Sequence, residues 1–86
     1  ILIVEWEANK RELEQILYES FEGWYLRHSL KKLYEVPVIF AALSGEEAVG
    51  IAMLEILNSS SSYIFYIAVK KRFRGSGIAS RLVRCS

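Results

Sequence analysis

Six basic residues and two closely spaced glycines lie together near the carboxyl end of the chain. Residues 63–86 carry a net charge of +6, whereas residues 1–62, with ten acids and five bases, carry −5. The six bases are Lys70, Lys71, Arg72, Arg74, Arg81 and Arg84. Gly75 and Gly77 stand among them, after an apolar run and before a helical pattern. Glycines let backbone N–H groups close on a ligand, and the unpaired N–H groups of a first helical turn carry partial positive charge. The helix dipole supplies only ~0.3–1 kcal/mol, so hydrogen bonds and bases must add to it. The segment therefore predicts an anion site that suits a diphosphate.

Two common nucleotide motifs do not fit this segment. A Walker loop needs Gly-Lys-Ser/Thr after its glycines, but Gly77 is followed by Ile78 and Ala79. A dinucleotide fingerprint needs a third glycine and a downstream acid, and the chain has neither after Gly75.

The elements that must position the segment are read from the spacing of apolar residues. Alternating or continuous apolar runs predict strands over residues 1–7, 38–43, 48–57 and 63–69. Apolar residues three and four apart predict a helix from Lys10 to Gly23, a second that stops before Pro37, and a third that opens near Gly77. Gly50 marks a bulge or a close approach of backbone early in its strand. The order β-α-α-β-β-β-α predicts an α+β fold around a largely antiparallel sheet.

With these elements in place, the segment resembles the acyl-CoA-binding motif of GNAT N-acetyltransferases, Arg/Gln-x-x-Gly-x-Gly/Ala. The matching residues are Ile67-Ala68-Val69 and, four residues later, Arg74-Gly75-Ser76-Gly77-Ile78-Ala79. A register that starts at Arg72 also satisfies the bare pattern, but the Arg74 register keeps the family's spacing from strand to motif. The resemblance implies a GNAT-like fold, with acetyl-CoA as acyl donor and an amine of a small molecule or protein as acceptor.

The same resemblance implies roles for individual backbone groups. The pantetheine arm would bond to the backbone of Ile67, Ala68 and Val69, and the N–H of Val69 would polarise the thioester carbonyl. The diphosphate would rest on the N–H groups of Gly75, Ser76, Gly77, Ile78, Ala79 and Ser80. From charge alone, Lys70, Lys71 or Arg74 is expected to help hold the phosphates.

No catalytic residue is assigned, and three residues are weak candidates. Some family members carry a catalytic glutamate six residues before the position of Val69, where this chain has Tyr63, a poor base at neutral pH. Glu55 falls at the rim of the sheet. Glu22 lies in the link that often shapes the acceptor pocket in this family, although an exposed helix end is its ordinary interpretation.

Other residues with functional side chains are interpreted as structural. His28, the single histidine, is predicted at the surface of a basic helix. Trp24, Tyr25 and Tyr34 are predicted to pack in the core, with a role in lining the acceptor site open for the first two. Cys85 is predicted to pack on the buried face of the last helix, with Ile78 and Leu82.

Composition limits the remaining possibilities. The 86 residues, 52% of them hydrophobic, predict one domain over 1–86 and exclude a disordered chain. A single cysteine excludes a disulfide framework or a zinc site built on cysteine pairs, and no metal site is expected. No apolar run reaches the ~20 residues of a membrane span and no leader pattern is evident, so we expect a cytoplasmic protein without membrane partners.

The resemblance extends only as far as the third helix. We therefore expect a partial domain that other sequence completes, or self-association along the exposed strand edge Tyr63–Val69. Two further functions stay open: acyl-CoA binding or regulation without catalysis, and a small module whose basic turn contacts a phosphorylated or nucleic-acid partner. Nucleic acid is not expected, because no aromatic platform accompanies the bases.

Overall fold

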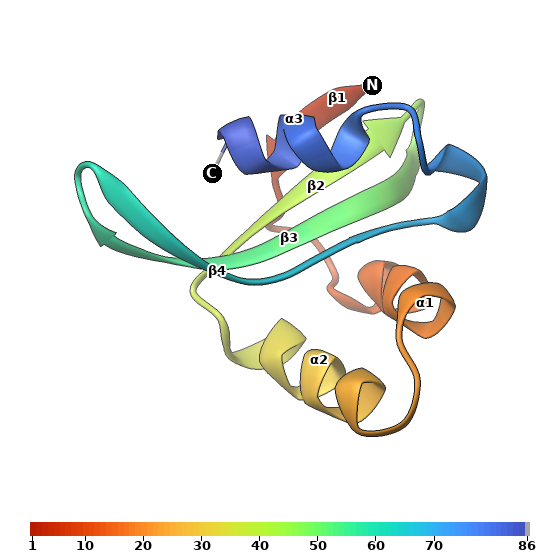
Figure 1. Cartoon of the computed structure of the whole chain (residues 1–86), viewed down its shortest axis with the longest axis horizontal. Coiled ribbons are helices and arrows are strands. Elements are labelled where there is room, and N and C mark those ends of the chain that lie inside the picture. Colours follow the sequence, from red (N-terminus) through yellow and green to blue (C-terminus); the bar gives the residue numbers. More distant parts are fainter. Residues whose placement is uncertain (86) are drawn as a thin grey trace.

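The computed structural model describes the backbone of residues 1–85 and the side chains of residues 1–84, so the prediction for the side chain of Cys85 lies outside the described residues. Three α-helices and four strands form an α+β fold (Figure 1). In chain order the elements are β1 (Leu2–Glu5), α1 (Arg11–Ser20), α2 (Gly23–Glu35), β2 (Val38–Ser44), β3 (Glu47–Asn58), β4 (Ser61–Val69), the 3-10 turn η1 (Lys71–Phe73) and α3 (Ile78–Cys85). The predicted order of elements is confirmed.

The four strands form one antiparallel sheet in the order β1-β2-β3-β4, so β4 is an edge strand. Several predicted boundaries are wrong. β1 ends at Glu5 rather than at residue 7, and the strands predicted over 48–57 and 63–69 extend to Asn58 and begin at Ser61, with only a short turn between them. Asn58 Oδ1 accepts a hydrogen bond from Ser60 N–H at 2.9 Å, which tightens the turn and lets the strands pair as far as Asn58 and Ser61.

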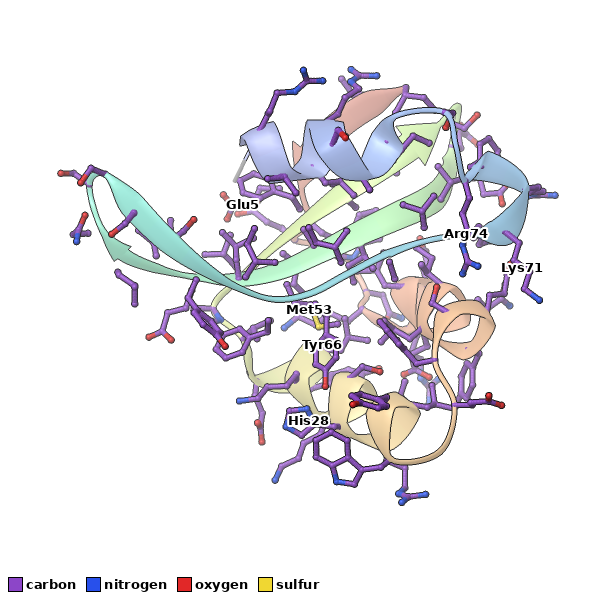
Figure 2. All side chains as sticks on the ribbon, in the orientation of Figure 1. Glu5, His28, Met53, Tyr66, Lys71 and Arg74 are labelled. Atoms are coloured by element: carbon purple, nitrogen blue, oxygen red, sulfur yellow. The ribbon has the colours of Figure 1, made fainter. Side chains whose placement is uncertain are left out.

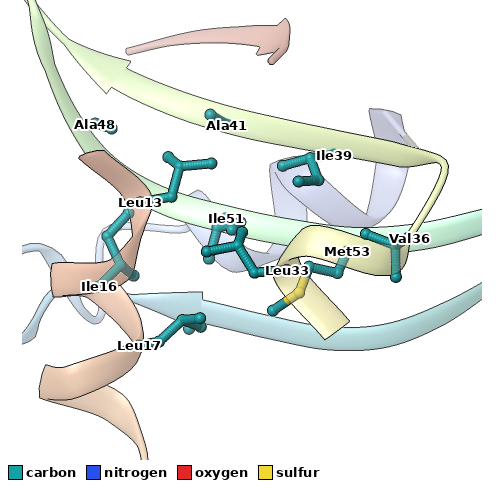
Figure 3. Close-up of a cluster of buried hydrophobic side chains, with 11 residues drawn as sticks. Leu13, Ile16, Leu17, Leu33, Val36, Ile39, Ala41, Ala48, Ile51 and Met53 are labelled. Atoms are coloured by element: carbon teal, nitrogen blue, oxygen red, sulfur yellow. The ribbon is translucent and has the colours of Figure 1, made fainter. Parts of the chain in front are cut away.

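Two apolar cores lie on opposite faces of the sheet. α1 and α2 cover one face, where Leu13, Ile16 and Leu17 of α1 pack with Leu33 of α2 against Ile51 and Met53 (Figure 3). α3 covers the other face, where Ile78 and Leu82 pack against Val49, Ala52 and Leu54. These cores fix the start of α3 beside the end of β4 (Figure 1).

Gly50 lets α3 approach the sheet closely. A Cβ atom at this position would lie 3.1 Å from Ile78 Cγ2 and 3.3 Å from Leu82 Cδ1. The register between β2 and β3 also shifts here, because Ala42 pairs with Gly50 and Leu43 with Ala48. Both features predicted for this glycine, a bulge and a close approach, are therefore present.

A second bulge changes the faces that β4 presents. Met53 pairs with Tyr66 and Leu54 with Ile64, which makes Phe65 the additional residue of a β-bulge. As a result Phe65 and Tyr66, although consecutive, both pack on the side of α1 and α2, while Ile64 and Ile67 pack on the side of α3.

The prediction that three aromatic residues of α2 lie in the core is wrong. Trp24, Tyr25 and Tyr34 are 59%, 61% and 52% exposed. The helix buries the narrow stripe that holds Ser29 and Leu33, and these rings fall outside it. The hydroxyl of Tyr34 donates to a carboxylate oxygen of Glu14 on α1, which keeps the ring at the surface between the two helices.

Candidate functional site

A groove of about 290 Å³ lies where β4 gives way to η1 and α3. Its walls are Val69, Phe73, Arg74, Gly75, Gly77, Ile78, Ala79 and Ser80. Gly75 and Gly77 have positive φ angles of 84° and 83°, and nothing lies within 4 Å of a Cβ atom built on either. Such angles are easy only for glycine, so these two residues turn the chain sharply and leave its backbone open to a ligand.

The backbone N–H groups of residues 75–80 are available to that ligand. The first backbone hydrogen bond of α3 runs from Arg81 N–H to Gly77 O at 3.1 Å, so the N–H groups of the preceding turn lie before the helical ladder begins. Among the described residues no acceptor is found for the N–H groups from Gly75 to Ser80. The two glycines are therefore not buried, and these N–H groups are not paired among the described residues, so both leave room for an anion.

The open edge of β4 continues from this groove. Lys70 N–H donates to Val49 O on β3 at 2.8 Å. Because successive residues of a strand direct their backbone groups to opposite sides, those of Val69 and Ile67 point away from β3, to the open edge. The same alternation directs the backbone of Ala68 toward β3. Val69 and Ile67 are thus the members of the predicted trio whose N–H groups face the open edge.

The bases around the groove are largely engaged with the protein. Lys70 is only 9% exposed, and its Nζ lies 3.0 Å from Glu47 Oε2, which Arg72 also contacts. The hydrogen bond from Lys70, with the bond and charge of Arg72 adding to it, lowers the pKa of Glu47. This carboxylate fastens η1 to the turn between β2 and β3. Lys71 is exposed, and its backbone N–H donates to Glu19.

Arg74 is exposed, and its guanidinium also connects the turn to two other segments. Its Nε donates to Val69 O at 2.9 Å and its Nη2 to Ser20 Oγ at 3.3 Å, joining the end of β4 to the end of α1. Figure 2 shows Arg74 and Lys71 on this side of the molecule. Of the three bases expected to hold phosphate, Lys70 is buried, whereas Lys71 and Arg74 are exposed and only Arg74 lines the groove.

The three weak catalytic candidates do not gather in one place. Tyr63 is 55% exposed and stacks edge to face on Phe65, with 4.8 Å between ring centroids. Glu55 is its direct partner across the β3–β4 hairpin and is also exposed. Glu22 lies apart from them, exposed at the residue that precedes α2. Among the described residues no three His, Cys, Asp or Glu side chains gather where they could hold a metal ion, and no helix is long and apolar enough to cross a membrane.

Sequence reasoning missed the pairing of two titratable rings. His28 Nδ1 of α2 lies 2.6 Å from Tyr66 Oη of β4, and both residues are half-buried (Figure 2). The prediction of a surface histidine is therefore wrong: the fold closes α2 over the edge of the sheet. The spacing of four residues between Trp24 and His28 could have predicted their stacking. Nothing in the sequence indicates a pairing across 38 residues.

Comparison with known proteins gives one family and several similar folds. A family model described as the acetyltransferase (GNAT) family matches residues 3–85, and no curated protein matches. The ribosomal-protein-S18-alanine N-acetyltransferase from Escherichia coli is similar with a TM-score of 0.76 and 15% identity, over 98% of this chain and 55% of that one. An IAA acetyltransferase from Bacillus cereus is similar with a TM-score of 0.69 and 20% identity, over 98% of this chain and 55% of that one. An aminoglycoside antibiotic 6'-N-acetyltransferase from Acinetobacter haemolyticus is similar with a TM-score of 0.59 and 20% identity, over 99% of this chain and 68% of that one. The chain thus spans about half the length of the first two structures.

Proposed function

The chain belongs to the GNAT family of acetyltransferases, and on that premise we propose that it binds acetyl-CoA in the α3 groove and serves the transfer of its acetyl group to an amine. The observation that carries this proposal is the continuity of the groove with the open edge of β4. Val69 lines the groove at the end of β4, whose outer edge pairs with no strand among the described residues, as a ligand with a charged head and a long amide-bearing arm requires. The single cysteine fits a reducing compartment, so the proposal places the protein in the cytoplasm.

The diphosphate is assigned to the N–H groups of residues 75–80. An anion there gains hydrogen bonds from donors that are otherwise unpaired, together with the positive end of the α3 dipole. Lys71 adds a mobile charge, whereas Lys70 and Arg74 act by holding the surrounding segments in place. The affinity therefore depends more on the shape of the backbone than on the number of bases.

The pantetheine arm is assigned to the outward backbone groups of Val69 and Ile67, which it pairs with as an added strand would. The arm carries two amide groups of its own before its thioester begins, and the groove starts at Val69. The N–H of Val69 is therefore used by the arm, and we assign polarisation of the thioester carbonyl to the N–H of Ile67 in place of that of Val69.

In the transfer itself, the amine nitrogen attacks the thioester carbonyl and the thiolate leaves. The acceptor, a small molecule or a protein, is left open by the proposal. A second function, acyl-CoA binding or regulation without catalysis, is favoured by one observation. At the position where some members of the family carry a catalytic glutamate, this chain has an exposed tyrosine, Tyr63.

Calorimetric titration tests the proposal with CoA, dephospho-CoA and ATP as ligands. We expect CoA and dephospho-CoA to bind and ATP to bind much more weakly, because ATP lacks the pantetheine arm. If ATP binds as tightly as CoA, the groove is a general phosphate site and the proposal fails. Release of thiol from acetyl-CoA in the presence of a panel of amines then separates transfer from binding alone.

A charge variant tests the placement of the diphosphate without disturbing the fold. Ser80→Glu puts a carboxylate in the first turn of α3, where it favours the helix by ~0.3–1 kcal/mol but repels an anion. Val83→Glu is the matched control, because Val83 is an exposed residue of the same helix outside its first turn. We expect Ser80→Glu to weaken CoA binding at least tenfold with no loss of stability, and Val83→Glu to bind as the parent does. Equal affinities would contradict the placement.

A further inference from the structure

The hydrogen bond between His28 and Tyr66 is the one contact in the described chain that joins two titratable rings from distant elements. The distance of 2.6 Å between His28 Nδ1 and Tyr66 Oη connects α2 to the edge strand. In Figure 2 the side chain of Tyr66 extends from β4 toward His28. Tyr66 shares this face with Ala68 by the regular alternation of the strand, and the bulge adds Phe65 beside it.

Aromatic rings surround the pair. Trp24 stacks on His28 with 4.8 Å between centroids and an interplanar angle of 8°, and Phe21 contacts Tyr66 edge to face at 5.3 Å. Burial, with a smaller contribution from the charge of Tyr25, raises the pKa of Tyr66, so its phenol is protonated at neutral pH. On the side of α1, Tyr66 contacts the uncharged ring of Phe21. The ammonium group of Lys32 lies over Phe65 rather than beside His28 and Tyr66. The raised pKa makes the phenol a weak acid, so it can pass its proton to the imidazole only as it receives one from the amine.

The pair lies next to the place where the acyl group is expected. Tyr66 directly precedes Ile67, whose outward N–H is assigned to the thioester carbonyl. An arm that runs from the groove along Val69 and then Ile67 ends beside Tyr66. The groove and α3 lie on one face of the sheet, whereas Tyr66 projects on the other, where the rings of Trp24 and Tyr25 are exposed. We expect an incoming amine to approach on this second face.

We propose, resting on the proposed acetyl transfer, that Tyr66 and His28 form the proton relay of the reaction. The lone pair of a neutral amine forms the N–C bond as the carbonyl electron pair moves to oxygen. The amine proton passes to Tyr66 Oη while the phenol proton passes to His28 Nδ1. When the oxyanion collapses, the C–S bond breaks, the thiolate leaves with its electron pair, and it takes up the proton that the imidazolium returns through solvent. Tyr66 is the catalytic residue of this relay, and His28 is the positioning residue that accepts the proton behind it.

One test needs no turnover, because His28 is the only histidine and its ring signals are unambiguous. The relay requires Tyr66 Oη to donate to Nδ1, which leaves the imidazole proton on Nε2. Long-range ¹H–¹⁵N spectra of the ring should therefore report the Nε2–H tautomer in the parent, and both nitrogen shifts should change in Tyr66→Phe. A proton found on Nδ1, or shifts that Tyr66→Phe leaves unchanged, would overturn the relay.

The second test is kinetic and uses a variant that separates hydrogen bonding from proton transfer. In His28→Asn the side-chain oxygen replaces Nδ1 and can still accept the bond from Tyr66, but it cannot take the proton. We expect His28→Asn and Tyr66→Phe each to lower kcat for amine-dependent thiol release about 10²-fold, with CoA affinity unchanged. His28→Asn should also lose the acidic limb of the pH–rate profile. Tyr34→Phe is the control. Tyr34 lies elsewhere on α2 and its hydroxyl bonds to Glu14 of α1, so this variant should keep the parent rate.

The outcomes separate this inference from the proposed function. If the parent chain does not bind CoA, the proposed function fails and the relay fails with it. If CoA binds and turnover is the same in the parent, His28→Asn and Tyr66→Phe, the relay alone is wrong. If CoA binds but the parent shows no amine-dependent thiol release, the relay is also wrong, while the CoA site stands.

Discussion

Substitution of Gly50 tests whether the close approach of α3 to the sheet holds the groove in shape. An alanine Cβ would lie 3.1 Å from Ile78 Cγ2, 3.3 Å from Leu82 Cδ1 and 3.4 Å from Ala42 Cβ. Overpacking of this kind costs about 1–3 kcal/mol. Replacing glycine inside a strand returns about 0.5–1 kcal/mol of backbone entropy. For Gly50→Ala the middle of the two ranges gives a net loss of about 1 kcal/mol, or roughly 4–8 °C in Tm for a domain of this size.

Urea denaturation followed by far-ultraviolet circular dichroism measures this loss. We expect CoA affinity to fall as well, because Ile78 is both the crowded residue and the first residue of α3. A double-mutant cycle with Ile78→Ala identifies the cause. That substitution alone costs about 2–5 kcal/mol, but it removes the nearest contact and leaves that with Leu82, so adding Gly50→Ala to it should cost less than in the parent.

Two results would refute this reasoning. A Gly50→Ala chain as stable as the parent would show that α3 yields without cost, and that the groove does not depend on the approach at Gly50. An equal cost of Gly50→Ala in the parent and in the Ile78→Ala background would show that the destabilisation comes from elsewhere.

Three further predictions follow from the site and its edge. The pKa of Glu47 is lowered from its ordinary value of 4.5, first by Lys70, so its contribution to stability is present above that value and is lost as the pH falls through the lower folded pKa. Glu47→Gln should thus lower the urea midpoint at neutral pH and match the parent in acid; a difference that is the same at both pH values would argue against the pair. Arg74→Lys keeps the charge but cannot maintain both bonds of the guanidinium, so it should lose about 1 kcal/mol of stability and weaken CoA binding as much as Arg74→Gln; full retention of affinity would mean that charge alone matters. The open edge of β4 should make the chain associate as its concentration rises. Saturating CoA should reverse this association, because it occupies the outward groups of Val69. Sedimentation that shows a monomer at every concentration would contradict the first expectation.

Most of the fold could be predicted because its signals are local. Apolar spacing is sufficient to place the helices and strands, and glycines mark the places where the backbone must turn or approach a neighbour. Gly50 is an example, since its position early in a strand predicted both features found there. The errors arose where tertiary packing determines which side chains are buried. Whether Trp24 and Tyr25 face the core or solvent depends on which stripe of α2 meets the sheet, and the helix alone contains apolar residues on more than one side.

The same distinction between local signals and tertiary packing applies to the candidate site. The open backbone at Gly75 and Gly77 is a property of a few consecutive residues, so its geometry could be expected from sequence. The occupation of Lys70 and Arg74 by protein partners could not, because Glu47 and Ser20 lie far away along the chain. The contact of His28 with Tyr66 could not be predicted either, because it joins residues 38 positions apart.

The most direct test of the account is a ¹H–¹⁵N correlation spectrum recorded during titration with CoA. The account predicts the largest amide shifts for residues 75–80, with Gly75 and Gly77 prominent, and further shifts at Val69 and Ile67 that dephospho-CoA reproduces and ATP does not. Saturable binding that leaves the amides of Gly75 and Gly77 unmoved, with shifts gathered on α2 or on the β3–β4 hairpin, would contradict it.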